Sequence, residues 1–187
     1  PNEKYPKSDS PWVVPYFTRA WARQGHEVQV VVNSTKFPKI YYYLAHTSLA
    51  SYFTRKYSVN VKNVSFNYWT KEFTFIDSGV NVVNFPLLKF YPGGVFLTKT
   101  LEKQKQKIVS YLMSKSFVPD VITGHWLNPQ LQLISSLKEV YECKTAFVFH
   151  SDYDKKRLMK FHVLSFISRI DRLGCRSLCA ANSLRDN

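Results

Sequence analysis

The stretch Pro119-Asp120-Val121-Ile122-Thr123-Gly124-His125-Trp126 decides the expected fold. Val121 and Ile122 are apolar and β-branched, which is typical of a buried strand in a parallel sheet. Pro129 suits the first turn of a following helix, because its missing N–H costs nothing there. His125 and Trp126 therefore stand at the carboxyl end of a predicted parallel strand. Open α/β sheets bind their ligands at that edge, so we expect a site here.

The composition is that of a globular protein. The chain has 187 residues, of which 45% are hydrophobic and 21% are charged. These values predict one domain with a sizeable core and argue against a disordered protein. No stretch approaches the roughly 18–20 apolar residues of a membrane-spanning helix, so an integral membrane protein is not expected.

The charge balance is the strongest signal in the composition. The chain has 26 Lys and Arg against 13 Asp and Glu, a net charge of +13. A surplus of this size attracts polyanions, and nucleic acid, anionic lipid and phosphorylated substrates are three candidates. Charge alone does not choose among them.

The cysteines do not indicate a metal centre. Cys143, Cys175 and Cys179 are odd in number, and their spacing matches no zinc pattern. We interpret them as buried free thiols of a reducing compartment, and we expect no metal site.

Hydrophobic periodicity and turn residues predict alternating helices and strands. The expected helices span 12–24, 39–57, 96–115, 129–141 and 161–173. The expected strands span 27–32, 72–76, 80–85, 120–125, 145–149 and 177–181. This order predicts an α/β fold with a Rossmann-like parallel sheet flanked by helices. Because the order opens on a loop and a helix, we expect a first strand before Pro1.

The helix expected at 39–57 carries an unusual load of tyrosines between basic residues. Two interpretations stay open for the segment from Lys36 to Tyr57. As a basic aromatic surface it would contact anionic lipid headgroups. As a half-buried helix it would use its tyrosines to close the core, and this second interpretation is the favoured one.

Four segments resemble motifs of the retaining GT-B glycosyltransferases, in the same order along the chain. Arg23-Gln24-Gly25-His26-Glu27-Val28 resembles the stretch after the first helix of that group, and the run at 119–126 resembles its "ProAspValIle-x-x-HisTrp" segment. Phe147-Val148-Phe149-His150-Ser151-Asp152 resembles its "ValHisGlySerAsp" strand end, with one residue fewer. Asn182-Ser183-Leu184-Arg185-Asp186 resembles a segment that follows. Residues 34–118 carry no aligned motif.

The resemblance implies that residues 1–187 form the N-terminal, acceptor-side domain of a two-domain enzyme. In that group a second domain, which this chain lacks, holds most of the nucleotide-sugar donor, and no further cofactor is needed. The implied activity is sugar transfer with retention and without a metal, in polysaccharide or glycolipid biosynthesis. The implied acceptor is a glycan or a sugar on a polyprenyl diphosphate. This chain alone is expected to be inactive.

The resemblance also implies roles for single residues. His150 matches a functionally important histidine of the group and is the catalytic candidate, with Asp152 placed to fix its tautomer. His125 could line the same cleft, with Asn128 at its rim. For Trp126, packing beneath the cleft is favoured over stacking on a sugar. Ser10 lies in a loop without glycine, so it could reach a phosphate only through its side chain.

The implied location is the cytoplasm, on the inner face of the cell membrane, where an anionic surface is a possible partner. Nucleic acid is not expected as a partner, because no recognisable nucleic-acid-binding motif occurs. Two alternatives remain open: a basic α/β domain that nevertheless binds nucleic acid, and a GT-B-shaped epimerase of sugar nucleotides. Loss of binding between low and moderate salt would indicate the first, and epimerisation without an acceptor the second.

Overall fold

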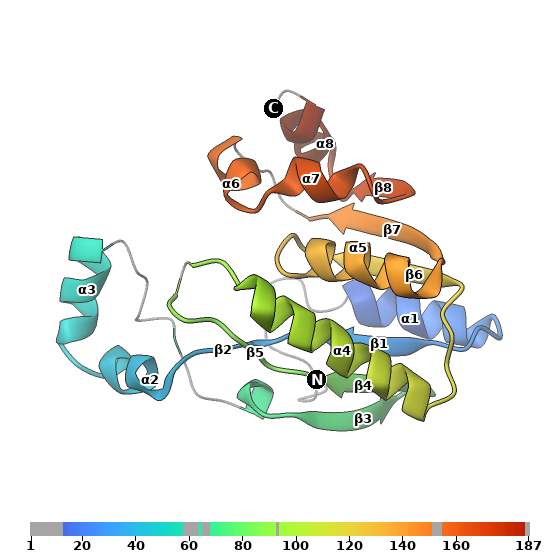
Figure 1. The fold of residues 1–187 in the computed structure, drawn as a ribbon, viewed down its shortest axis with the longest axis horizontal. Coiled ribbons are helices and arrows are strands. Elements are labelled where there is room, and N and C mark those ends of the chain that lie inside the picture. The colour runs from blue at the N-terminus through green and yellow to red at the C-terminus, as the bar shows by residue number, and fades with distance from the viewer. Residues whose placement is uncertain (1–12, 58–63, 65–67, 93, 151–154, 186–187) are drawn as a thin grey trace. The chain divides into compact units, whose positions relative to one another are not determined.

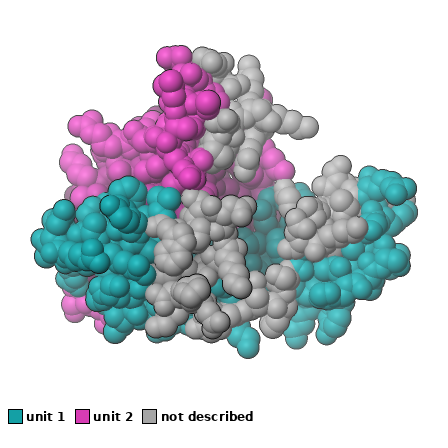
Figure 2. All heavy atoms as spheres, turned by 180° about the vertical axis from the view of Figure 1, so that it is seen from behind, with its two compact units in different colours: residues 1–94 teal, residues 95–187 magenta. Residues whose placement is uncertain are grey.

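The computed structural model describes residues 13–57, 64, 68–92, 94–150 and 155–185. It divides into two compact units, Pro1–Gly94 and Val95–Asn187, which Figure 2 colours separately. Helices and strands alternate along both units, and parallel strand pairs occur in each (Figure 1). The expected α/β class is therefore confirmed.

Unit 1 is built around a sheet in which strand order is β1-β4-β3. β1 and β4 are parallel, while β3 and β4 form an antiparallel hairpin. A short parallel pair, β2 with β5, forms a second sheet. The elements are α1 (Val13–Arg23), β1 (Gln29–Val32), β2 (Thr35–Lys36), α2 (Lys39–Ala45), α3 (Leu49–Tyr57), η1 (Tyr68–Thr70), β3 (Phe73–Asp77), β4 (Val80–Asn84) and β5 (Leu87–Leu88).

The hairpin of unit 1 follows from its turn residues, as the sequence predicts. Asp77 pairs with Val80, so the loop consists of Ser78 and Gly79. Both loop residues have positive φ, 52° and 84°. Two-residue hairpin loops favour this conformation because its twist matches that of the strands, and Gly79 adopts it without steric cost.

Unit 2 contains a fully parallel sheet of order β6-β7-β8. Helix α5 contacts β6 and β7, and its apolar residues pack with Phe147 and Phe149 of β7 in the core of this unit. Its elements are α4 (Thr98–Ser114), β6 (Val121–His125), α5 (Gln130–Tyr141), β7 (Lys144–Phe149), α6 (Lys155–Lys160), α7 (Val163–Ile167), β8 (Arg172–Cys175) and α8 (Leu178–Arg185).

The prediction of one continuous helix over 39–57 is wrong. The structure has two helices, α2 and α3, separated by His46-Thr47-Ser48. The Thr47 hydroxyl donates a hydrogen bond to the Leu44 carbonyl oxygen at 2.9 Å. The Thr47 N–H donates to the same carbonyl oxygen at 3.1 Å, and α2 ends at Ala45.

The predictions for 161–181 hold only in part. The expected helix is present from Val163 to Ile167, but its last residues, Arg172 and Leu173, belong to strand β8. The prediction of a strand at 177–181 is wrong, because helix α8 begins at Leu178 and the Ser177 hydroxyl caps it by accepting a hydrogen bond from the Ala180 N–H.

Other differences are smaller. Strand β5 and helix α6 were not predicted. Cys143 is buried, but Cys175 and Cys179 are exposed, so the prediction of three buried thiols is wrong for these two. In the part of the chain that the structure describes, we find no helix with the length and apolar character to cross a membrane.

Candidate functional site

Two histidines meet where the neighbouring parallel strands β6 and β7 end. His125 is the last residue of β6, and His150 follows Phe149, the last residue of β7. The register pairs His125 with Val148, so both chains leave the sheet at its carboxyl edge. Nδ1 of His125 lies 2.9 Å from Nε2 of His150, a hydrogen-bond distance. Parallel pairing of the two strands therefore creates the contact.

Trp126 completes the cluster. Its indole ring stacks on the His150 ring, with ring centroids 4.8 Å apart and planes inclined by 20°. The backbone of Trp126 has φ of 61°, in the left-handed region that bulky residues rarely adopt. This turn takes the chain out of β6 and sets the indole over His150. Trp126 is 40% exposed, so the favoured interpretation of this residue as core packing is wrong.

Burial keeps both imidazoles neutral at pH 7. Burial, and then the neighbouring His150, lower the pKa of His125 from 6.5 to about 4. Burial also lowers the pKa of His150, and the positive charge of Arg176 lowers it further. Arg176 follows β8, and its N–H donates to the Phe149 carbonyl oxygen at 2.8 Å. The carboxyl edge thus combines two neutral imidazoles with one permanent cation.

The two imidazoles share one hydrogen bond. In the contact between Nδ1 of His125 and Nε2 of His150 one ring donates and the other accepts, and the tautomers set the direction. Nδ1 of His150 is buried and has no hydrogen-bond partner among the described residues.

The cluster can present an aromatic face held in a fixed position. Nε2 of His150 is engaged by His125, and Nδ1 is buried, so the exposed group is the indole of Trp126. The His150 ring stacks behind the indole, and the contact with His125 Nδ1 fixes the position of the His150 ring. A ligand reaches a nitrogen of His150 only by displacing one of these contacts. Among the described residues, no group of three His, Cys, Asp or Glu side chains could hold a metal ion.

The structure brings together three of the six residues singled out from the sequence: His125, Trp126 and His150. Asn128 is half-buried, two positions after Trp126. Ser10 and Asp152 lie outside the described residues. Sequence reasoning missed Arg176, because the strand that places it beside His150 was predicted as the end of a helix.

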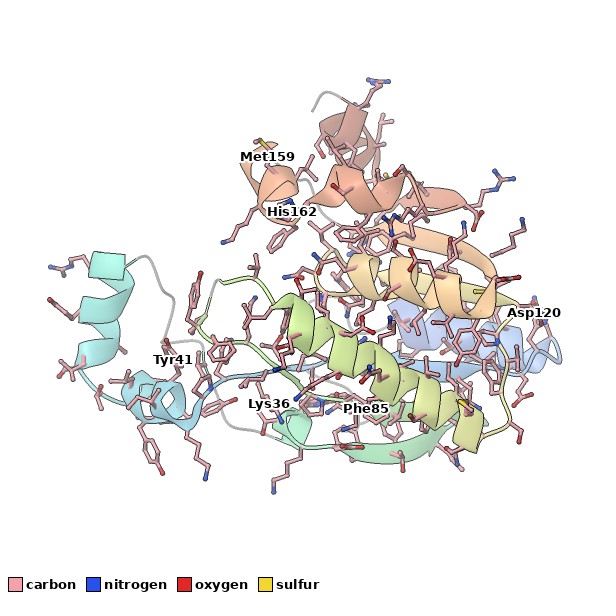
Figure 3. All side chains as sticks on the ribbon, viewed as in Figure 1. Lys36, Tyr41, Phe85, Asp120, Met159 and His162 are labelled. Carbon is pink, nitrogen blue, oxygen red and sulfur yellow. The ribbon has the colours of Figure 1, made fainter. Side chains whose placement is uncertain are left out.

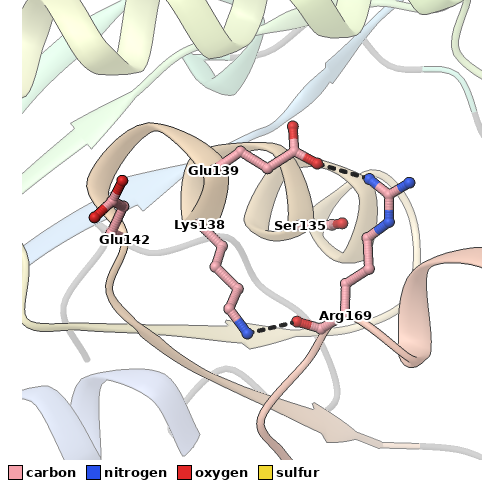
Figure 4. Close-up of a pocket in the computed structure, with 5 residues that line it drawn as sticks. All are labelled: Ser135, Lys138, Glu139, Glu142 and Arg169. Carbon is pink, nitrogen blue, oxygen red and sulfur yellow. Dashed lines mark hydrogen bonds and ion pairs between the residues drawn. The ribbon is translucent and has the colours of Figure 1, made fainter.

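A pocket of about 380 Å³ lies elsewhere in unit 2 (Figure 4). Glu139 Oε1 pairs with an Arg169 guanidinium nitrogen at 2.7 Å, and Lys138 Nζ donates to the Arg169 carbonyl oxygen at 2.9 Å. These charges already stabilise one another, so we assign no ligand to the pocket. It is lined by Ser135, Lys138, Glu139, Glu142 and Arg169.

Comparison with protein-family models and with curated proteins finds no match to this chain.

Proposed function

We propose that this chain is the acceptor-side domain of a sugar-nucleotide-dependent glycosyltransferase that builds a polysaccharide or a glycolipid. The finer fold that we propose is one Rossmann-like half of a GT-B enzyme. The observation that carries the proposal is the cluster of His125, His150 and Trp126 at the carboxyl ends of adjacent parallel strands. This is the edge at which open α/β sheets bind ligands, and two of the GT-B-like motifs end there.

In this proposal the indole of Trp126 is the first contact of the acceptor sugar. Aromatic faces combine apolar contact area with a fixed orientation, and the apolar face of a sugar ring can stack on them. His150 holds the indole from behind and reaches the sugar once the ligand displaces one of its contacts. As a neutral imidazole it can then accept a hydrogen bond from a sugar hydroxyl or donate one to a sugar oxygen.

The donor nucleotide sugar would bind mainly to a second domain of the whole enzyme. Transfer would retain the anomeric configuration and require no metal. The acceptor would be a glycan or a sugar carried on a polyprenyl diphosphate. We place this work at the inner face of the cell membrane, where the net charge of +13 favours an anionic surface or a diphosphate.

Binding of acceptor mimics tests the proposal without any need for turnover. Isothermal titration calorimetry would measure binding of soluble oligosaccharides and of farnesyl-diphosphate-linked monosaccharides to the 187-residue chain. We expect at least one of them to bind, and Trp126→Ala to weaken it about tenfold through the lost stacking surface. His150→Ala should weaken it less, because the indole remains.

The matched control is His26→Ala, since His26 is exposed and lies outside the cluster. This control should bind like the parent chain. If none of the probes binds, or if Trp126→Ala and His26→Ala bind equally well, the proposed function is wrong.

A further inference from the structure

We propose that the helices α2 and α3 form a docking surface for an anionic lipid membrane. This inference deepens the proposed function, which places the protein at an anionic membrane face, and it rests on a surface of unit 1, whereas the proposed acceptor site lies in unit 2. We call this surface the α2–α3 surface and define it by six exposed residues: Lys39, Ile40, Tyr43, Leu49, Tyr52 and Arg55.

The first argument is that the helices expose their large apolar side chains. Ile40 is 57% exposed and Tyr43 is 72% exposed, and the two are three positions apart on α2. Leu49 and Tyr52, both 51% exposed, repeat this spacing on α3. Residues three apart on a helix lie on one face, so each helix presents an aliphatic side chain beside a tyrosine. The favoured interpretation, in which these tyrosines close the core, is therefore wrong for Tyr43 and Tyr52.

The neighbouring tyrosines show why only part of the segment is turned outward. Tyr41 and Tyr42 are half-buried, and the Tyr42 hydroxyl oxygen accepts a hydrogen bond from the Phe37 N–H at 2.8 Å. Tyr41, which Figure 3 labels, packs against the Phe37 ring, with ring centroids 6.3 Å apart. On α3, the small residue Ala50 is the buried one, at 1% exposure. Tyr41, Tyr42 and Ala50 are thus packed locally, whereas the residues of the α2–α3 surface face solvent.

The second argument is charge. Between Glu27 and Glu72 the sequence contains no acidic residue and six basic ones: Lys36, Lys39, Arg55, Lys56, Lys62 and Lys71. Lys39 and Arg55 are exposed on α2 and α3 themselves. An anionic surface is complementary to such a segment, because each basic residue held near an anionic membrane strengthens binding.

The combination favours lipid over nucleic acid. Tyrosine and basic side chains suit both partners, because tyrosine also stacks on bases. Exposed Ile40 and Leu49 suit only the lipid, since aliphatic side chains gain by entering the acyl boundary and have no π-face for a base. Membrane binding of this kind needs apolar and electrostatic contributions together, and the α2–α3 surface supplies both.

Vesicle flotation tests the inference with the 187-residue chain. The probes are vesicles of pure phosphatidylcholine and vesicles of phosphatidylcholine mixed with phosphatidylglycerol. We expect binding to the mixed vesicles and little binding to the neutral ones. The double variant Lys39→Glu/Arg55→Glu should weaken binding by about tenfold or more, because it reverses two charges near the lipid surface. The double variant Ile40→Ser/Leu49→Ser should weaken binding even in low salt.

The matched controls change basic and apolar residues that are exposed on α4 of unit 2. Lys99→Glu/Lys103→Glu makes the same change in net charge, and Met113→Ser removes a side chain that is 70% exposed. Both controls should float with the mixed vesicles nearly as well as the parent chain. All these positions are exposed, so circular dichroism should show unchanged folding.

Three outcomes would overturn the inference. One is equal loss of binding in the α4 controls, which would mean that only net charge matters. Another is binding of a labelled RNA, in place of vesicles, that depends on Lys39 and Arg55. A third is a dimer in analytical ultracentrifugation that Ile40→Ser/Leu49→Ser abolishes while vesicle binding is absent. Trp126→Ala should float normally, so failure here and failure of the proposed function can be told apart.

Discussion

Gly124 of β6 lies directly beneath Ile134 of α5, so that a β-carbon on Gly124 would overlap the Ile134 side chain. The same β-carbon would come within 3.1 Å of the Phe147 ring. The overlapping atom is the terminal Cδ1 of Ile134, so a larger residue at Gly124 would force this side chain to move in the core beneath α5.

The first prediction concerns this contact. Gly124→Ala should lower the free energy of unfolding by about 1–3 kcal/mol, the usual cost of forcing extra atoms into a packed core. Urea denaturation would measure it. Gly174→Ala is the control, because its β-carbon would lie 3.6 Å from Val148 and meet only ordinary contacts. Equal losses in the two variants would show that packing against Ile134 is not the cause.

The second prediction concerns acid. The unfolded chain protonates His125 near pH 6.5, whereas the folded chain does so only at about pH 4. The unfolded state therefore binds more protons in this window, and stability falls as the pH drops from 6.5 towards 4. The loss should be roughly 2–3 kcal/mol, with the full stability present above pH 6.5.

Denaturation at a series of pH values would measure this slope. His125→Asn should reduce the slope between pH 6.5 and 4, and the part that remains belongs to His150, whose pKa burial also lowers. His26→Ala, at an exposed position, should leave the slope as it is. An unchanged slope in His125→Asn would contradict the prediction.

The third prediction concerns the link between β7 and the start of β8. The Thr145 N–H and hydroxyl each donate to Asp171 Oδ2 at 2.8 Å, and the Asp171 N–H donates back to the Thr145 hydroxyl oxygen at 3.2 Å. Thr145 is 1% exposed. Thr145→Val should cost about 1–3 kcal/mol of unfolding free energy, because buried groups lose their partner. Thr145→Ser keeps the hydroxyl and should recover most of that loss.

Acid should also weaken the contact between Asp171 and Thr145, at a lower pH than the one at which His125 titrates. Hydrogen bonds from Lys138 and from Thr145 hold the pKa of Asp171 well below its usual range. Its carboxylate therefore contributes stability that is present above its ordinary pKa of 3.8 and is lost as the pH falls below it. In Asp171→Asn this further loss below pH 3.8 should be smaller, as measured by thermal unfolding.

The fourth prediction concerns unit 1. Arg19 of α1 donates two hydrogen bonds to Asp77 at the hairpin, both 2.9 Å, and the Asp77 residue is 6% exposed. Arg19→Met should cost about 3–5 kcal/mol, because it leaves a buried carboxylate without its charged partner. Arg19→Lys should recover only part of this, since an ammonium group cannot form the two-pronged contact. Arg23→Met, at an exposed position on the same helix, should be nearly neutral.

Local sequence signals predicted the helices and strands whose residue patterns agree with the packing of these elements in the structure. The strand before His125, the two strands at 72–76 and 80–85, and the helix ending before Gly25 were all found. The strand at 172–175 was missed because its apolar residues continue a helical pattern. Its pairing with β7, reinforced by the contact between Asp171 and Thr145, overrides that pattern, and no residue near it in sequence reveals this.

The sequence by itself determined the α/β class and the placing of His125 and Trp126 at a strand end, because alternating apolar segments and turn residues act locally. Only the tertiary structure decided that Nδ1 of His125 meets Nε2 of His150, because the two residues are 25 positions apart and their distance depends on the register of the two strands. It also decided which tyrosines of 39–57 face solvent, because burial is set by what packs against a helix and not by the helix itself.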